Sequence, residues 1–74
     1  MKQPRKNRDW YHELNSLIDM VTPTGGDSDC TQASKMNVLH IVCQKIEWCW
    51  KWKRITEDQM KDLSQKATKC WGLF

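Results

Sequence analysis

Residues 34–54, SKMNVLHIVCQKIEWCWKWKR, decide the fold of this chain. Their apolar side chains recur every three or four positions, and this spacing predicts a helix. The apolar surface spans more than half of the helix circumference and is formed by Val38, Leu39, Ile41, Val42, Ile46, Trp48, Cys49, Trp50 and Trp52. Such a helix has to be covered on two sides. One short partner helix would leave part of this surface uncovered.

A shorter helix precedes this stretch, and a loop separates the two. Its apolar stripe has helical spacing and consists of Trp10, Leu14, Leu17, Ile18 and Val21. The helix begins either in a first turn that contains Pro4 or after Asp9 as its N-cap. Residues 22–34 are rich in proline, glycine and small polar residues, which predicts a loop that ends with Ser34 as the N-cap of the second helix.

A third helix is predicted for the remainder of the chain. Thr56 and Gln59 occupy the positions of a capping box, and Ile55 and Met60 occupy those of a hydrophobic staple. Gly72 is placed to end the helix. The apolar stripe of this helix is formed by Met60, Leu63, Ala67, Cys70, Trp71 and Phe74.

These elements predict an all-α fold, a helix-loop-helix with an additional C-terminal helix. We divide the 74 residues into a short basic arm (1–9), a helix-loop-helix module (10–54) and a third amphipathic helix (55–74). A chain of this length buries little surface, so a partner chain, a metal or disulfides have to be considered. The sequence therefore raises the question of what completes the core.

The four cysteines have neither the spacing nor the histidine pairing of a tetrahedral zinc site. Cys43 and Cys49 fall on one predicted helix, and no secretion signal indicates an oxidising compartment. We therefore expect buried or half-buried thiols, with no metal and no cofactor.

The net charge is +3, and the first nine residues concentrate positive charge in Lys2, Arg5, Lys6 and Arg8. No apolar run approaches the length of a bilayer span or forms a signal core. We therefore expect an intracellular protein with no membrane partner.

The segment KMNVLHIVCQKI, residues 35–46, resembles the second helix of basic helix-loop-helix transcription factors, most closely the class that carries PAS domains. In that family a lysine opens the helix, and an aliphatic residue, a Val/Ile-Leu pair and further core positions follow it. The first predicted helix agrees with the family pattern through LNSLIDMVTP, residues 14–23. The resemblance covers residues 10–49.

This resemblance implies a homodimer, or a heterodimer with another helix-loop-helix protein, in which each chain contributes two helices to a four-helix bundle. It also implies a nuclear transcriptional regulator. The implied dimer interface consists of Trp10, Leu14, Leu17, Val21, Val38, Leu39, Val42, Ile46 and Cys49.

The resemblance further implies contact with double-stranded DNA through Lys2, Arg5, Lys6, Arg8 and Lys35. The family reads its E-box with a glutamate and an arginine pair, whereas MKQPRKNRD contains no glutamate and Pro4 interrupts it. E-box binding is therefore expected to be weak or to depend on the partner. A heterodimer with one competent basic region would make this chain an inhibitor.

Two alternatives remain open from the residues alone. The runner-up is a monomeric three-helix nucleic-acid-binding domain in which the third helix packs back on the first two, and a further alternative is a protein-interaction adaptor with no nucleic-acid role. Trp48 and Trp52 share a helix face with Ile41, which predicts core packing combined with an exposed anchor for a partner. No catalytic motif is present, so we expect neither an enzyme nor a small-molecule substrate.

Overall fold

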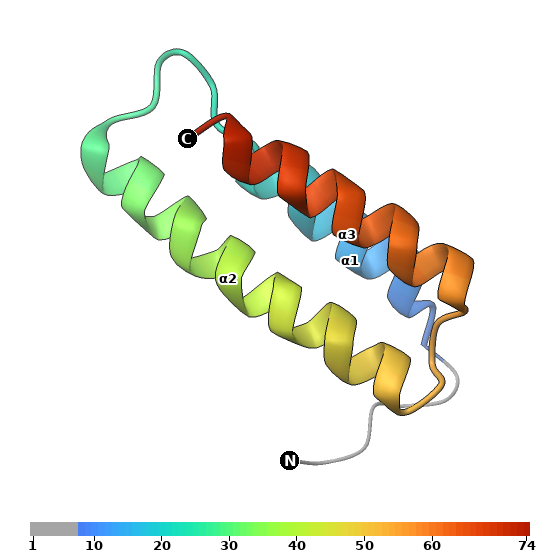
Figure 1. Cartoon of the computed structure of the whole chain (residues 1–74). Helices are drawn as coiled ribbons and strands as arrows, with labels where there is room; N and C mark the ends of the chain where they lie inside the picture. Colours follow the sequence, from blue (N-terminus) through green and yellow to red (C-terminus); the bar gives the residue numbers. More distant parts are fainter. Residues whose placement is uncertain (1–7) are drawn as a thin grey trace.

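The computed structural model describes residues 8–74 and contains three helices, α1 (Trp10–Val21), α2 (Asp29–Lys51) and α3 (Glu57–Gly72). Figure 1 shows them side by side, with a longer loop between α1 and α2 and a short joint between α2 and α3. The all-α fold and the order helix, loop, helix, additional helix are as the sequence predicts.

Asp9 begins α1, which decides between the two starts that the sequence allows. Its side chain accepts a hydrogen bond from the backbone N–H of His12, so Asp9 is the N-cap. The same carboxylate also contacts the His12 ring. The hydrogen bonds from His12 hold the pKa of Asp9 below its usual value.

The predicted start of the second helix at Ser34 is wrong. Helix α2 begins at Asp29, and Ser28 is its N-cap, with its hydroxyl accepting from the backbone N–H of Thr31 at 3.2 Å. The polar run after Gly26 contains no further proline or glycine, and Asp29 lies where the helix dipole favours an acid. Only residues 22–28 therefore connect α1 to α2.

Helix α2 ends in a Schellman motif that carries a lysine where glycine is usual. The N–H of Arg54 donates to the carbonyl of Cys49 at 2.8 Å, and the N–H of Lys53 donates to that of Trp50 at 3.0 Å. Lys53 has a φ of 58°, in the left-handed region. The chain reverses here within a few residues and enters α3.

The predicted capping box at the start of α3 is confirmed. The Thr56 hydroxyl accepts from the backbone N–H of Gln59, and the Gln59 side chain accepts from the backbone N–H of Thr56, both at 3.1 Å. The staple residues Ile55 and Met60 both belong to the core cluster, Ile55 fully and Met60 partly buried. The start of α3 is thus encoded locally.

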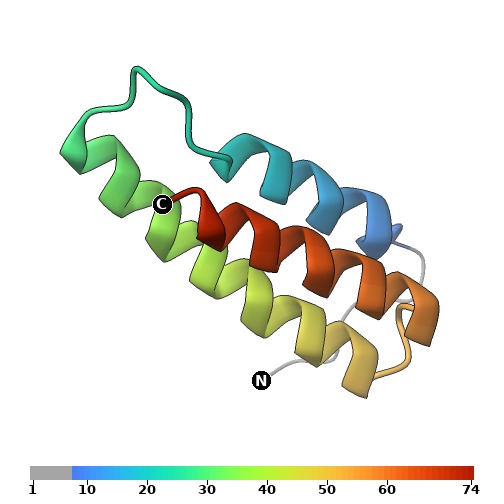
Figure 2. The same ribbon diagram turned by 45° about the horizontal axis from the view of Figure 1, so that its top comes forward.

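Each helix packs against the other two, and α3 lies along both α1 and α2 (Figure 2). Their apolar stripes form one core. Its buried members are Trp10, Leu14, Ile18, Val21, Leu39, Val42, Ile46, Cys49, Ile55, Leu63, Ala67 and Cys70. Helix α3 is therefore the element that completes the core of this chain.

Polar contacts fix α3 against α1 along its length. The Tyr11 hydroxyl donates to the Asp62 carboxylate at 2.5 Å, and this contact raises the pKa of Tyr11. Lys66 reaches Asn15 at 2.5 Å and Asp19 at 2.6 Å. Because each contact joins one specific residue of α1 to one of α3, the contacts set the register of the two helices more strictly than apolar packing does.

Within residues 8–74, no helix has the length and apolar character needed to cross a membrane.

Candidate protein-interaction surface

Most of the predicted dimer interface lies inside the chain's own core. Seven of its nine residues are buried against α3 and one another: Trp10, Leu14, Val21, Leu39, Val42, Ile46 and Cys49. Leu17 is half-buried at the edge of the core, and Val38 is 37% exposed. The single chain therefore offers Val38 and part of Leu17, rather than the predicted nine residues, to another molecule.

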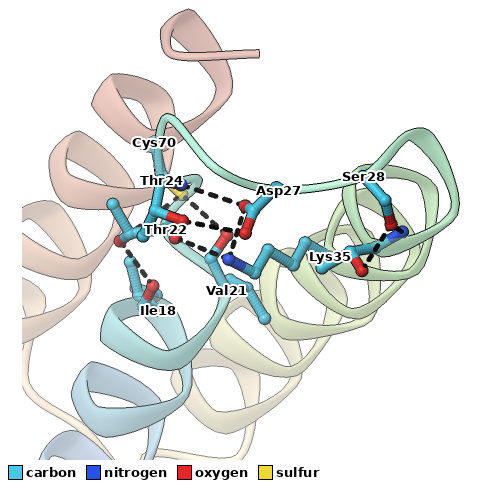
Figure 3. Close-up of polar contacts among 9 residues, drawn as sticks. Ile18, Val21, Thr22, Thr24, Asp27, Ser28, Lys35 and Cys70 are labelled. Atoms are coloured by element: carbon cyan, nitrogen blue, oxygen red, sulfur yellow. Dashed lines mark hydrogen bonds and ion pairs between the residues drawn. The ribbon is translucent and has the colours of Figure 1, made fainter.

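Lys35, predicted to contact DNA, instead holds the loop between α1 and α2. Its ammonium donates to the Asp27 carboxylate at 2.6 Å and to the carbonyl of Thr22 at 3.1 Å, as Figure 3 shows. Only 18% of its side-chain surface is exposed. Lys35 thus ties the C-cap residue of α1, Thr22, to Asp27 of the loop, and it is not available to a phosphate in this conformation.

Asp27 is the centre of this loop network (Figure 3). Besides Lys35, it accepts from the backbone N–H of Thr24 at 2.9 Å and from the Thr24 hydroxyl at 2.8 Å. Together these donors, with Lys35 the largest contributor, lower the pKa of Asp27 to about 2. We define Thr22, Thr24, Asp27 and Lys35 as the loop clamp.

Arg8 is the remaining predicted DNA contact that the structure describes. Its guanidinium pairs with the Glu13 carboxylate and lies 5.0 Å from the centre of the Trp10 ring. The side chain therefore packs on the start of α1. Lys2, Arg5 and Lys6 lie outside the described residues.

A second apolar surface of α2 is left exposed. Six residues share about a third of the helix circumference at about 100° per residue, and we call them the α2 outer face: Val38, Ile41, Gln44, Lys45, Trp48 and Trp52. Ile41 is 49% exposed and Trp52 is 38% exposed. This is the face on which the sequence places an aromatic anchor.

The α2 outer face is hollowed at its centre. Ile41, Gln44, Lys45 and Trp48 line an open, mostly apolar pocket of about 270 Å³. A second hollow continues toward the start of α2, where Val38 takes part with Val21 of α1. Residues of α3 line neither hollow. The two hollows are separate, and the central pocket is the one formed by side chains of the α2 outer face alone.

Trp48 forms one wall of the central pocket, and its ring packs against Trp10 of α1. Its ring meets that of Trp10 edge to face, with 6.0 Å between centroids. Its indole Nε1 is buried and has no hydrogen-bond partner among residues 8–74. The position of Trp48 is therefore set by apolar packing, which fixes the pocket wall on a rigid core.

The charges beside this pocket are mostly positive. Residues 44–54 contain Lys45, Lys51, Lys53 and Arg54 but a single acid, Glu47. Glu47 lines a different hollow, with Cys43 and Trp50, on the side of α2 that meets α3. On α1, the nearby Glu13 is already neutralised by Arg8. The α2 outer face thus combines apolar anchors with the positive charge of Lys45, and further basic residues follow at the end of α2.

The cysteines are free thiols, and three of the four are at least half-buried. Cys49 and Cys70 are buried, Cys43 is half-buried and Cys30 is exposed, so the expectation of buried thiols is wrong for Cys30 alone. Burial raises the pKa of the Cys49 thiol, which disfavours the reactive thiolate. Among residues 8–74, no three histidine, cysteine or acidic side chains lie close enough together to hold a metal ion.

Sequence reasoning identified the face of Ile41, Trp48 and Trp52 but not the hollow between its side chains. The signal for the face is helical periodicity, whereas the hollow depends on Trp10 setting the position of Trp48. The loop clamp was missed because an ion pair eight residues apart across a turn has no periodic signature. Comparisons of this chain with protein-family models, with curated proteins and with solved structures found no match.

Proposed function

We propose that this chain is a monomeric protein-interaction module that binds a partner through the α2 outer face. One observation carries the proposal. Seven of the nine residues that a helix-loop-helix dimer would use are buried in the chain's own core, while a separate apolar face with its own pocket stays exposed. A single chain therefore completes its core and keeps a surface for another protein.

The physical properties of the α2 outer face suit this role. Exposed tryptophan side chains are frequent energetic centres of protein interfaces, because they bury a large apolar area with few rotatable bonds. The opposite side of α2 carries Leu39, Val42 and Ile46, all buried in the core. The face is thus presented on a rigid helix, which limits the entropy lost on binding.

Dimerisation as in the helix-loop-helix family remains a competing hypothesis, with E-box binding and inhibitory heterodimers as its consequences. It requires α3 to leave the core, since Leu39, Val42 and Ile46 cannot contact α3 and a second chain at once. The cost is the exposure of the apolar stripe of α3, whose buried members are Leu63, Ala67 and Cys70. A monomeric nucleic-acid-binding domain gains no support from Arg8 and Lys35, which are engaged within the chain.

The proposal is tested by selecting peptides from a random display library against the folded chain. We expect binders whose affinity falls at least about tenfold for Ile41→Ser, the loss typical of an interface centre. The matched control is Leu73→Ser, since Leu73 is 63% exposed and lies just beyond α3. We expect the control to keep its affinity within about twofold.

Peptides that bind Ile41→Ser and wild type equally well would place the binding surface elsewhere. Circular dichroism of both variants checks that each keeps the helical content of the wild type.

A further inference from the structure

The charges of the α2 outer face narrow the class of partner. Lys45 is half-buried and lines the pocket itself, beside Ile41 and Trp48. Lys51 lies one turn after Trp48 on the other side of the pocket, at a helical angle near that of Gln44. Within residues 8–74, neither lysine forms an ion pair. Two unpaired cations therefore flank an apolar hollow.

We propose that the α2 outer face binds an acidic amphipathic helix of a partner protein. This inference rests on the proposed function and names the partner of the same surface. Ile41 and Trp48 lie about two turns apart and both line the pocket, so a helix lying across the pocket would contact them with apolar residues at i, i+3 or i+4, and i+7. Aspartate or glutamate on either side of that apolar stripe would meet Lys45 and Lys51.

A second copy of this chain fits the face less well. An isologous contact through the α2 outer face brings like surfaces together, so the Lys45 and Lys51 ammonium groups of the two copies share one interface. Like charges brought together at an interface weaken binding and suppress the wrong partner. An acidic helix supplies the opposite charge at the same positions.

The test is a display library of helical peptides with four fixed apolar positions, at i, i+4, i+7 and i+11. The positions flanking this stripe carry glutamate, glutamine or lysine in equal proportion. We expect wild type to enrich glutamate at the flanking positions. The double variant Lys45→Glu, Lys51→Glu should enrich lysine instead, because both cations that face the partner are reversed.

Titration calorimetry then compares one selected peptide with its glutamine and lysine counterparts. Wild type should bind the glutamate peptide at least about tenfold more tightly than the lysine peptide, and the reversed variant should invert this order. Raising the salt concentration should shrink the difference. If the double variant does not fold, the residues that wild type selects at the flanking positions test the acidic preference: enriched glutamate supports it, and no enrichment of glutamate overturns it.

The outcomes separate this inference from the proposed function. Equal binding of all three peptides, lost in Ile41→Ser, would overturn the acidic preference and leave the interaction surface standing. Peptides that bind independently of Ile41 would overturn both. Tighter binding to phosphatidylserine vesicles or to single-stranded DNA than to any peptide would also overturn the acidic-helix partner, since both probes use the same cations and aromatic rings.

Discussion

At the scale of single residues, Lys35 and Asp27 join the two ends of the loop between α1 and α2. The pair is largely shielded from water, with 18% and 10% of the side-chain surface exposed. A charged pair of this kind is costly to break, because the remaining partner keeps its charge in a partly desolvated place. The loop conformation therefore depends on the ionisation of Asp27.

Acid should weaken the fold through Asp27. Its pKa lies at about 2 in the folded chain, below the ordinary value of about 3.9. A lowered pKa means that the folded state favours the carboxylate, so the stabilisation is complete above about pH 4 and is lost as the pH falls toward 2. We expect the Tm of wild type to fall over this range by more than that of Asp27→Asn.

Thermal unfolding followed by circular dichroism between pH 5 and pH 2 measures this difference. The other carboxylates are common to both proteins, so the gap between the two curves reports Asp27. Curves that remain parallel down to pH 2 would contradict the assigned role of the loop clamp.

Two residues only two positions apart on α2 should differ strongly in how much their truncation destabilises the chain. Leu39 is 0% exposed in the core, whereas Ile41 is 49% exposed on the α2 outer face. We expect Leu39→Ala to lower the free energy of unfolding by about 2–5 kcal/mol and Ile41→Ala to lower it by less than about 1 kcal/mol. Urea unfolding gives both values, and similar losses at the two positions would mean that Ile41 is also covered.

At the scale of the elements, the turn from α2 into α3 places a lysine in a backbone conformation that favours glycine. Lys53 occupies the left-handed position of the Schellman motif, where a side chain costs about 1 kcal/mol relative to glycine. The motif nevertheless forms because the Arg54 and Lys53 N–H groups satisfy two helix carbonyls and Ile55 is buried directly afterwards. Tertiary packing outweighs the preference of this one residue.

Replacing Lys53 by glycine should therefore stabilise the chain by up to about 1 kcal/mol. Lys51→Gly is the matched control, since Lys51 ends α2 in the helical conformation, where glycine costs about 1 kcal/mol. Urea unfolding of both variants should give changes of opposite sign. Destabilisation by Lys53→Gly would show that the lysine side chain makes a contact worth more than its backbone strain.

The sequence predicts the three helices, but it does not predict all of their starts. Periodicity was enough for α1 and for the apolar side of α2, and the pair Thr56 and Gln59 marked the start of α3. The start of α2 was placed six residues late because Ser28 and Ser34 are both plausible caps. A cap pattern alone does not choose between the two serines, whereas the structure caps α2 with Ser28 and places Asp29 in its first turn.

At the scale of the whole molecule, the width of the apolar surface on α2 had two explanations. The sequence left open whether α3 or a second chain covers the part of this surface that α1 does not. In the structure, α3 packs on both other helices and fixes its register through Tyr11–Asp62 and Lys66–Asp19. Such polar pairs between distant segments have no sequence signature, so periodicity alone could not assign α3 to the core.

The packing of α3 in the core also explains why the candidate interaction surface lies on a different side of α2 from the predicted dimer interface. The stripe of Leu39, Val42 and Ile46 is buried within the chain, whereas Ile41 and Trp52 of the other stripe are exposed and Trp48 is half-buried. The sequence predicted both stripes. Only the packing of α3 shows which of them is available.

Sedimentation equilibrium over a hundredfold range of protein concentration, in reducing buffer, tests whether α3 completes the core within a single chain. A chain whose core is completed by its own α3 should remain a monomer of 8.8 kDa throughout this range. A reversible dimer that Val42→Asp dissociates into a folded monomer would contradict it, because Val42 would then lie in an interface between chains instead of under α3.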